Sequence, residues 1–312
     1  MAKESNFVSA VVYVHNNEDC IENILGKLNS ELENNFLHYE IILVNDASTD
    51  DSVAKIKHII QANSNSMVQI VNLSYFHGVE MAMNAGVDLA IGDFVYEIDT
   101  CDVDYDSDLW LKVYHKSLEG FDIVSAAPEK GSSVGSSIFY NLMNNFSNNK
   151  HALKTERFRI LSRRAINRIH AMNLNIPYRK SLYVNCGLEQ TSIIYSPNKV
   201  HGTLGGDKEL ENYRWNTAVD VLILFSNIGY RFTFGMSCLM LMLSVVLGLY
   251  ALSYFAVGEP VSGWTSIVCV LSIGFAGIFA VTTIMIKYLD IIINLIFKRQ
   301  NYVIKGIEKI VC

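Results

Sequence analysis

Two long runs without a charged residue constrain the fold of this chain more than any other feature of its sequence. One extends from Phe232 to Gly258 and the other from Pro260 to Ile286. Each exceeds the ~20 residues that an α-helix needs to cross a bilayer. A pair of buried helices in a large soluble core is the alternative, but such helices usually carry charge on one side. The sequence therefore predicts two transmembrane helices, at about 232–257 and 264–286.

Positive charge gathers on one side of these runs. Glu259 lies between them without a Lys or Arg, whereas five basic residues follow the second run. This asymmetry places both termini in the cytoplasm. The apolar start of the last segment is expected to lie along the membrane surface rather than to continue the second helix. The predicted plan is a cytoplasmic domain 1–228, a transmembrane hairpin 229–287, and an interfacial amphipathic segment with a basic cytoplasmic tail over 288–312.

The part of the chain before the apolar runs is acidic. Of 25 Lys+Arg and 31 Asp+Glu residues in the whole chain, only six basic and three acidic ones follow Gly229. Excess negative charge argues against binding to nucleic acid, and it agrees weakly with an enzyme that recruits a divalent cation. The 6 cysteines show no paired spacing, so neither a disulfide framework nor a zinc site is indicated.

Short apolar runs alternate with amphipathic segments over the first hundred residues. The runs are rich in β-branched residues, as buried parallel strands are, and the segments between them have helical spacing. Repeated β-α-β alternation predicts an α/β fold with a mostly parallel sheet and helices on both faces. The expected strands are 7–14, 39–44, 67–73 and 94–98, and the expected helices are 18–34, one that begins near 50–52, and 78–90.

Polar clusters follow three of the expected strands, at the sheet edge where α/β proteins bind ligands. Asp46 directly follows the second strand, where its carboxylate can accept hydrogen bonds from a base or a ribose. Asp99 follows the fourth strand, with Asp102 close behind. Carboxylates this close repel one another unless a cation lies among them. Bound Mg²⁺ or Mn²⁺ would stabilise a leaving diphosphate; a solvated acidic loop is the open alternative.

The order of these motifs resembles that of the family 2 glycosyltransferases with the GT-A fold. The resemblance is closer to the polyprenyl-phosphate branch, which includes dolichol-phosphate mannose synthase-like and bactoprenol glucosyltransferase-like enzymes. It is carried by SAVVYVHNNE, EIILVNDASTDDS, LSYFHGVEMAMNAGVDLAIGDFVYEID and RFRILSRRAI. Two spans and a basic tail after a domain of this size also resemble the membrane-anchored bacterial members.

The resemblance implies a Rossmann-like GT-A domain in the bacterial inner membrane that uses a nucleotide-diphosphate sugar and a divalent cation, Mg²⁺ or Mn²⁺. The sugar would pass with inversion to a polyprenyl phosphate such as undecaprenyl phosphate, and a homo-oligomer is a further expectation. Implied donor-binding residues are Tyr13, His15, Asn17, Asp46, Ser48, Gly78, Glu80 and Asp99. Implied catalytic residues are Asp99, Asp102, Glu156 and Arg159, of which Asp99 and Asp102 would be metal ligands.

This sequence departs from the family pattern in the metal motif and in the acceptor loop. The metal motif, usually Asp-x-Asp, is one residue longer here, from Asp99 to Asp102, and the acceptor loop offers only Lys130. Two alternatives therefore stay open. The acceptor is a sugar hydroxyl on a lipid-linked glycan, with Glu156 or Asp102 as base, or the protein is a degenerate scaffold that binds a nucleotide sugar.

Other basic residues are candidates for the acceptor phosphate, because guanidinium groups bind phosphate in bidentate fashion. Solvated helix charges are the alternative explanation for most of them. The candidates beside Arg159 are Arg157, Arg163, Arg164, Arg179, Lys180, Lys199 and Lys208.

Overall fold

The computed structural model describes residues 3–62, 67–129, 155–172, 178–198, 208–225, 263–297 and 302–310, together with scattered positions between 232 and 246. The chain forms two compact units. The first consists of Met1–Asn144, Asn149–Ala218 and Arg299–Cys312, and the second of Asn145–Asn148 and Val219–Lys298. The C-terminal residues thus return to the first unit after the apolar segment.

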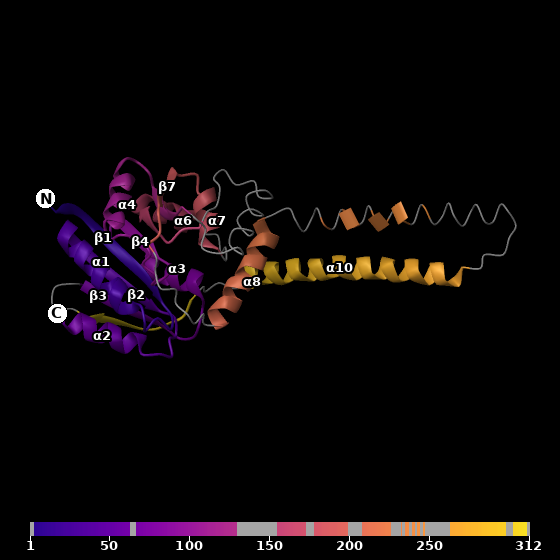
Figure 1. Ribbon diagram of the computed structural model, residues 1–312, viewed down its shortest axis with the longest axis horizontal. Coiled ribbons are helices and arrows are strands. Elements are labelled where there is room, and N and C mark those ends of the chain that lie inside the picture. The colour runs from indigo at the N-terminus through magenta and orange to yellow at the C-terminus, as the bar shows by residue number, and fades with distance from the viewer. Residues whose placement is uncertain are drawn as a thin grey trace. The chain divides into compact units, whose positions relative to one another are not determined.

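An eight-stranded sheet forms the centre of the first unit (Figure 1). Its strands are β1 (Glu4–Val14), β2 (Phe36–Asn45), β3 (Met67–Leu73), β4 (Phe94–Ile98), β5 (Ile123–Pro128), β6 (Phe158–Ser162), β7 (Gln190–Tyr195) and β8 (Ile304–Ile310). The order across the sheet is β7-β5-β6-β4-β1-β2-β3-β8. The pairs β1–β2, β1–β4, β2–β3 and β5–β7 are parallel. β6 and β8 run antiparallel to their neighbours. The mostly parallel α/β sheet expected from the sequence is confirmed.

Helices cover both faces of this sheet, because successive strand residues point to opposite sides. In β1, Val8, Ala10 and Val12 pack into one core while Val11 and Tyr13 pack into the other. The first core is completed by α1 (Ile21–Asn35), α2 (Ser52–Ala62) and α4 (Asp108–Leu118). The second is completed by α3 (Val79–Leu89), α6 (Arg163–Met172) and α7 (Arg179–Asn185).

The C-terminal strand β8 corrects the expectation of a basic tail. It pairs antiparallel with β3, with Glu308 opposite Ile70 and Gly306 opposite Asn72. The open edge of β3 offers unpaired backbone groups, and a strand carrying lysines suits an outer edge. The prediction is therefore wrong for Ile304–Ile310, since the pairing partner lies far away in the sequence.

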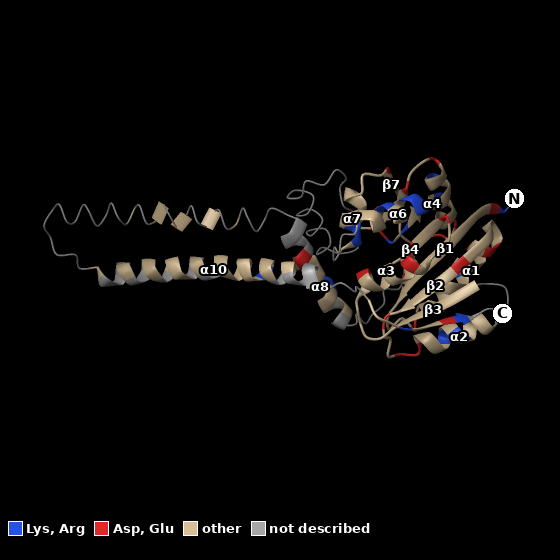
Figure 2. Ribbon diagram, turned by 180° about the vertical axis from the view of Figure 1, so that it is seen from behind, with Lys and Arg blue, Asp and Glu red and all other residues tan. Residues whose placement is uncertain are grey.

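The second unit contains α10 (Trp264–Phe297), which runs without interruption through the second apolar run. Its sequence carries only Lys287 and Asp290 as charged residues. Most of the part of α10 that Figure 2 colours is accordingly tan. The prediction of a separate segment from residue 288 is wrong, because nothing in the sequence breaks the helix there. Lys287 Nζ lies 2.8 Å from Asp220 Oδ1 of α8 (Lys208–Phe225).

The predicted transmembrane hairpin stays a prediction. None of the helices in the described part of the chain has the length and apolarity of a membrane span. The first predicted span, about 232–257, lies largely outside the described residues, and the second falls within α10.

Packing of α3 against the sheet yields a stability prediction. A Cβ added at Gly86 would lie 2.3 Å from Val11 Cγ1 and 2.7 Å from Val44 Cγ2, and stiff β-branched neighbours cannot rotate away. We expect Gly86→Ala to lower the free energy of unfolding by about 1–3 kcal/mol. Gly26→Ala on α1, where an added Cβ would meet nothing beyond the adjacent helix backbone within 4 Å, should raise the free energy of unfolding by about 0.5–1 kcal/mol. Chemical unfolding of the full chain measures both, and a Gly86→Ala protein as stable as wild type would contradict the packing argument.

Candidate active site

Two carboxylates at the end of β4 face two arginines that come from separate elements. Arg159 of β6 donates from Nη1 to Glu97 Oε2 (2.8 Å) and from Nη2 to Asp99 Oδ2 (3.0 Å). Arg179, at the start of α7, donates from Nη1 to Glu97 Oε1 (2.8 Å) and from Nη2 to Asp99 Oδ1 (2.6 Å). Each guanidinium therefore bridges the same two carboxylates, which its planar fork of donors permits.

The sheet register creates half of this arrangement. In the antiparallel pair of β4 and β6, Glu97 lies directly opposite Arg159, and opposite charges in such a position attract. Both residues are 1% exposed. Burial of a charge without a partner is costly, so the register and the ion pair support each other.

Four further side chains complete what we call the carboxylate–arginine network. Glu80 Oε2 accepts hydrogen bonds from the Arg179 backbone N–H (2.9 Å) and Nε (3.0 Å). Glu156 Oε2 accepts from Arg159 Nε at 3.1 Å, and Lys180 Nζ lies 3.8 Å away from the same oxygen. The Tyr183 hydroxyl donates to Glu97 Oε1 at 2.7 Å.

The network stays charged because its members hold one another in their ionised forms. Burial alone would raise the pKa of Asp99, but the charges of Arg179 and Arg159 outweigh it and hold this pKa well below its usual range. Burial would likewise lower the pKa values of the two arginines; Asp99 and the neighbouring glutamates instead raise them well above normal. Burial and Glu97 raise the pKa of Tyr183, which is therefore neutral. Asp99 is thus a poor proton acceptor.

The role of Asp99 and Asp102 as metal ligands stays a prediction. Both oxygens of Asp99 already accept from guanidinium groups, which neutralise its charge. The Asp102 backbone N–H bonds to Thr100 Oγ1 at 3.2 Å. The described residues include no group of three His, Cys, Asp or Glu side chains that could hold a metal ion. A divalent cation therefore stays a prediction.

Asp46 organises a second cluster, which we call the donor loop cluster, at the end of β2. Its Oδ1 accepts from the His77 backbone N–H and its Oδ2 from the Gly78 backbone N–H, both at 2.8 Å. Tyr13 donates its hydroxyl to Oδ2 at 3.2 Å. Gly78 has φ +83°, which favours glycine. Burial raises the pKa of Asp46. Its carboxylate thus positions the chain at residues 77–78, and its role in binding a base stays a prediction.

The remaining expected donor residues lie around this cluster. His15 Nδ1 lies 2.6 Å from the Asp46 carbonyl oxygen, and its ring lies 4.7 Å from that of Phe76. The backbone N–H of Asn17 donates to Ser52 Oγ at 2.8 Å, at the start of α2. Ser48 Oγ accepts from a backbone N–H at 3.2 Å. These contacts shape the loops after β1 and β2.

Several residues of the site were missed by sequence reasoning. Glu97 could have been found from the sequence, because a carboxylate inside an apolar strand that is expected to be buried requires a partner of opposite charge. Tyr183 had no such signal. Tyr213 of α8 was also missed; its ring covers Gly78, where an added Cβ would lie 2.1 Å from Tyr213 Cζ.

Most of the basic candidates for an acceptor phosphate are engaged elsewhere. Arg157 pairs with Asp104 at 2.8 Å, Arg164 pairs with Asp122, and Arg163 donates to backbone carbonyls before β4. Arg179 belongs to the carboxylate–arginine network, as does Lys180. The predicted acceptor loop with Lys130, together with Lys199, lies outside the described residues.

Removal of the central carboxylate tests the network. Glu97→Gln leaves two buried guanidinium groups short of negative charge, so we expect the free energy of unfolding to fall by about 3–5 kcal/mol. Asp108→Asn breaks an exposed pair with Lys112 (2.7 Å) and should change it by less than about 0.5 kcal/mol. If chemical unfolding showed that Glu97→Gln and Asp108→Asn change the free energy of unfolding by equally small amounts, the role of Glu97 would be contradicted.

The depressed pKa of Asp99 gives a pH test. A carboxyl group with a folded pKa below its unfolded value, about 3.9, stabilises the protein above that value and loses this effect as pH falls through the folded pKa. The stability difference between wild type and Asp99→Asn should therefore be equal at pH 7 and pH 5, and should shrink only under stronger acid. If burial dominated, the folded pKa would lie above the unfolded value, and wild type would instead gain stability relative to Asp99→Asn as pH falls from 7 to 5.

Comparisons with known proteins identify the family. Residues 9–185 match the model of Glycosyl transferase family 2. The chain is 28% identical to an uncharacterized glycosyltransferase of Synechocystis sp., over 86% of this chain and 85% of that one. It is 27% identical to a prophage bactoprenol glucosyl transferase homolog of Escherichia coli, over 97% of this chain and 99% of the other.

A solved structure agrees with the fold. A mannosyltransferase from Pyrobaculum calidifontis, solved in complex with GDP-Man and Mn²⁺, superposes with a TM-score of 0.51 at 13% identity, over 94% of this chain and 88% of that one. This likeness supports the GT-A architecture, and the family model decides the enzyme class. The chain belongs to glycosyl transferase family 2 and is a glycosyltransferase.

Proposed function

We propose that the protein transfers a sugar from a nucleotide-diphosphate sugar to a polyprenyl phosphate such as undecaprenyl phosphate. The observation that carries this proposal is the carboxylate–arginine network, which fixes Asp99 at the carboxyl end of β4, where such sheets bind ligands. The Escherichia coli relative, named for bactoprenol and aligned over nearly all of both chains, supports the lipid acceptor.

The chemistry of an anionic acceptor matches the electrostatics of the site. An acceptor phosphate oxygen attacks the anomeric carbon of the donor sugar, the bond from that carbon to the diphosphate breaks, and the nucleoside diphosphate leaves. The phosphate is already ionised, so the step needs no base. Asp99 cannot readily serve as one, because its pKa lies well below the usual range. A sugar hydroxyl would need Glu156 or Asp102 as base, and Glu156 already accepts from Arg159 Nε at 3.1 Å.

The chain contributes position and fixed charge. Asp99 is 24% exposed at its side chain, so it can accept hydrogen bonds from donor hydroxyls while two guanidinium groups hold its orientation. Prior orientation lowers the entropic part of the barrier, and fixed charges need no rearrangement during the reaction. The network therefore acts as a rigid platform for the donor sugar.

Attachment to a bacterial inner membrane, with the catalytic domain cytoplasmic, is part of the proposal. It is supported by the two charge-free runs and by exposed apolar side chains on α10, such as Ile267, Phe275 and Ile278. A bilayer would cover such side chains, and attachment would keep the active site near a lipid phosphate. A homo-oligomer stays a prediction.

Transfer in membranes tests the proposed function. Membranes containing the wild-type protein should convert undecaprenyl phosphate and one of a panel of labelled nucleotide sugars into a lipid-linked product. Asp99→Asn should lower the rate about 100-fold, because the donor platform loses its charge and orientation. Asp108→Asn, whose ion pair on α4 is exposed, should keep the wild-type rate.

Two outcomes would oppose the proposal. Absence of a lipid-linked product with every donor, under conditions in which a known polyprenyl-phosphate enzyme works, would remove the acceptor assignment. Full activity of a folded Asp99→Asn protein would remove the platform role of the network.

A further inference from the structure

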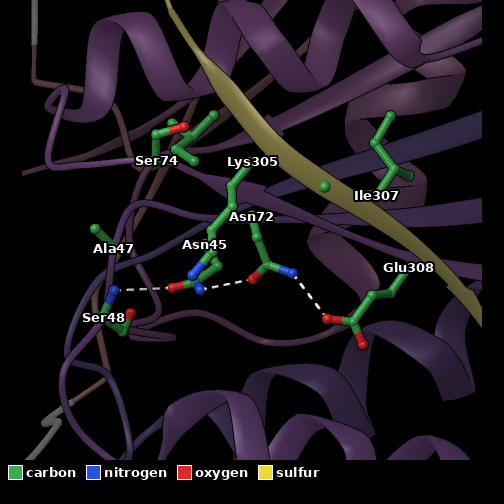
Figure 3. A pocket seen from close by; sticks show the side chains of 10 residues that line it. Asn45, Ala47, Ser48, Asn72, Ser74, Lys305, Ile307 and Glu308 are labelled. Carbon is green, nitrogen blue, oxygen red and sulfur yellow. Dashed lines mark hydrogen bonds between the residues drawn. The ribbon is translucent and has the colours of Figure 1, made fainter.

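A pocket of about 540 Å³ opens between the ends of β2 and β3 and the start of β8 (Figure 3). Pockets of this size hold small molecules or parts of cofactors. Its polar lining comes from strands at opposite ends of the chain. These polar residues are Asn45, Ser48, Asn72, Ser74, Lys305 and Glu308.

One wall of the pocket is a continuous chain of hydrogen bonds. The Ser48 backbone N–H donates to Asn45 Oδ1 (3.0 Å), and Asn45 Nδ2 donates to Asn72 Oδ1 (2.8 Å). Asn72 Nδ2 donates to Glu308 Oε1 (2.9 Å), whose other oxygen lies 2.7 Å from Lys57 Nζ. Figure 3 draws the three hydrogen bonds of this chain as dashed lines and does not draw the contact with Lys57. The three bonds fix the orientation of the amides of Asn45 and Asn72. The wall is therefore arranged before any ligand arrives.

Lys305 lies at an irregularity of β8. In the register with β3, Gly306 is opposite Asn72 and Ile304 is opposite Leu73, so Lys305 is an extra residue between the two pairs. Such bulges redirect side chains and are frequent next to active sites. Lys305 lines the pocket, is exposed, and forms no ion pair within the described part of the chain. Its ammonium group is thus available to a ligand.

The start of β8 is also tied to the donor loop cluster. The Val303 backbone N–H donates to His77 Nε2 at 3.1 Å, and the Val303 carbonyl accepts from the Ser74 backbone N–H at 2.9 Å. His77 in turn donates its backbone N–H to Asp46. The position of Lys305 therefore depends on the same loop that carries the expected donor residues.

The place of the pocket in the sheet relates it to Asp99. Neighbouring strands lie about 4.8 Å apart, so the end of β4 is about 10 Å from that of β2 and about 14 Å from that of β3. An extended nucleoside diphosphate reaches across such a distance. Its sugar-bearing end would lie near Asp99 and its nucleoside end at the pocket.

We propose that this pocket binds the nucleoside portion of the donor and that Lys305 of β8 is a specificity residue that donates to it. The lining mixes amides, hydroxyls, an ammonium and the carboxylate of Glu308, which suits a base and ribose and disfavours a phosphate. This inference rests on the proposed function, because it assumes a nucleotide donor. It adds that a strand beyond the apolar segment takes part in donor recognition.

Calorimetry on the detergent-solubilised full chain tests the inference. The ligands are UDP and GDP, the matching monophosphates, and pyrophosphate. The variants are Lys305→Met and, as the matched control, Lys309→Met on the same strand. Methionine keeps most of the aliphatic stem of lysine, so folding and packing of β8 should persist, which a thermal unfolding scan checks.

Loss of one hydrogen bond from a charged donor should weaken binding about tenfold. We expect Lys305→Met to weaken the preferred diphosphate and its monophosphate by the same factor and to leave any pyrophosphate binding unchanged, with Lys309→Met like wild type. Three results would overturn the inference while the proposed function stands. Lys305→Met could bind with wild-type affinity, or both variants could lose affinity equally. The loss of affinity could also be confined to diphosphates and pyrophosphate. If wild-type protein binds neither nucleotide, the proposed function itself fails.

Discussion

Glu97 is the residue on which the arrangement of the site depends. Two guanidinium groups, those of Arg159 and Arg179, are buried beside it, and each uses one of its oxygens. A buried guanidinium without a compensating charge would be too costly to keep. The carboxylate of Glu97 therefore allows β4, β6 and α7 to meet at one place, and the orientation of Asp99 follows from that meeting.

The two clusters at the sheet edge form one framework, because a short segment connects them. Gly78 donates its backbone N–H to Asp46, and two residues later Glu80 accepts from Arg179. The start of α3 thus holds the donor loop cluster at one side and the carboxylate–arginine network at the other. A displacement of this segment would therefore disturb both clusters together.

Local patterns account for what could be predicted from the sequence. The strands 67–73 and 94–98 match the structure in both bounds, since apolar β-branched runs with polar ends report directly on a buried strand. Asp99 and Arg159 were also found, from motif order. The role of Arg179 was not, because its partners come from α3 and β4 and no spacing near it records them. β8 was missed for the same reason, as its short sequence shows no alternation and its partner strand lies early in the chain.

The late return of β8 has an energetic consequence for the pocket beside it. The chain leaves the first unit after Ala218 and re-enters it at Arg299, so pairing with β3 closes a long loop. Closure entropy grows only slowly with loop length, and the ladder of backbone bonds, together with the Val303–His77 contact, offsets it. β8 is nevertheless an edge strand with many exposed side chains, the kind of element that opens before the core. A donor that contacts Lys305 would bind the closed form alone and stabilise it by mass action, so donor binding and the pairing of β8 with β3 are coupled by the same contact.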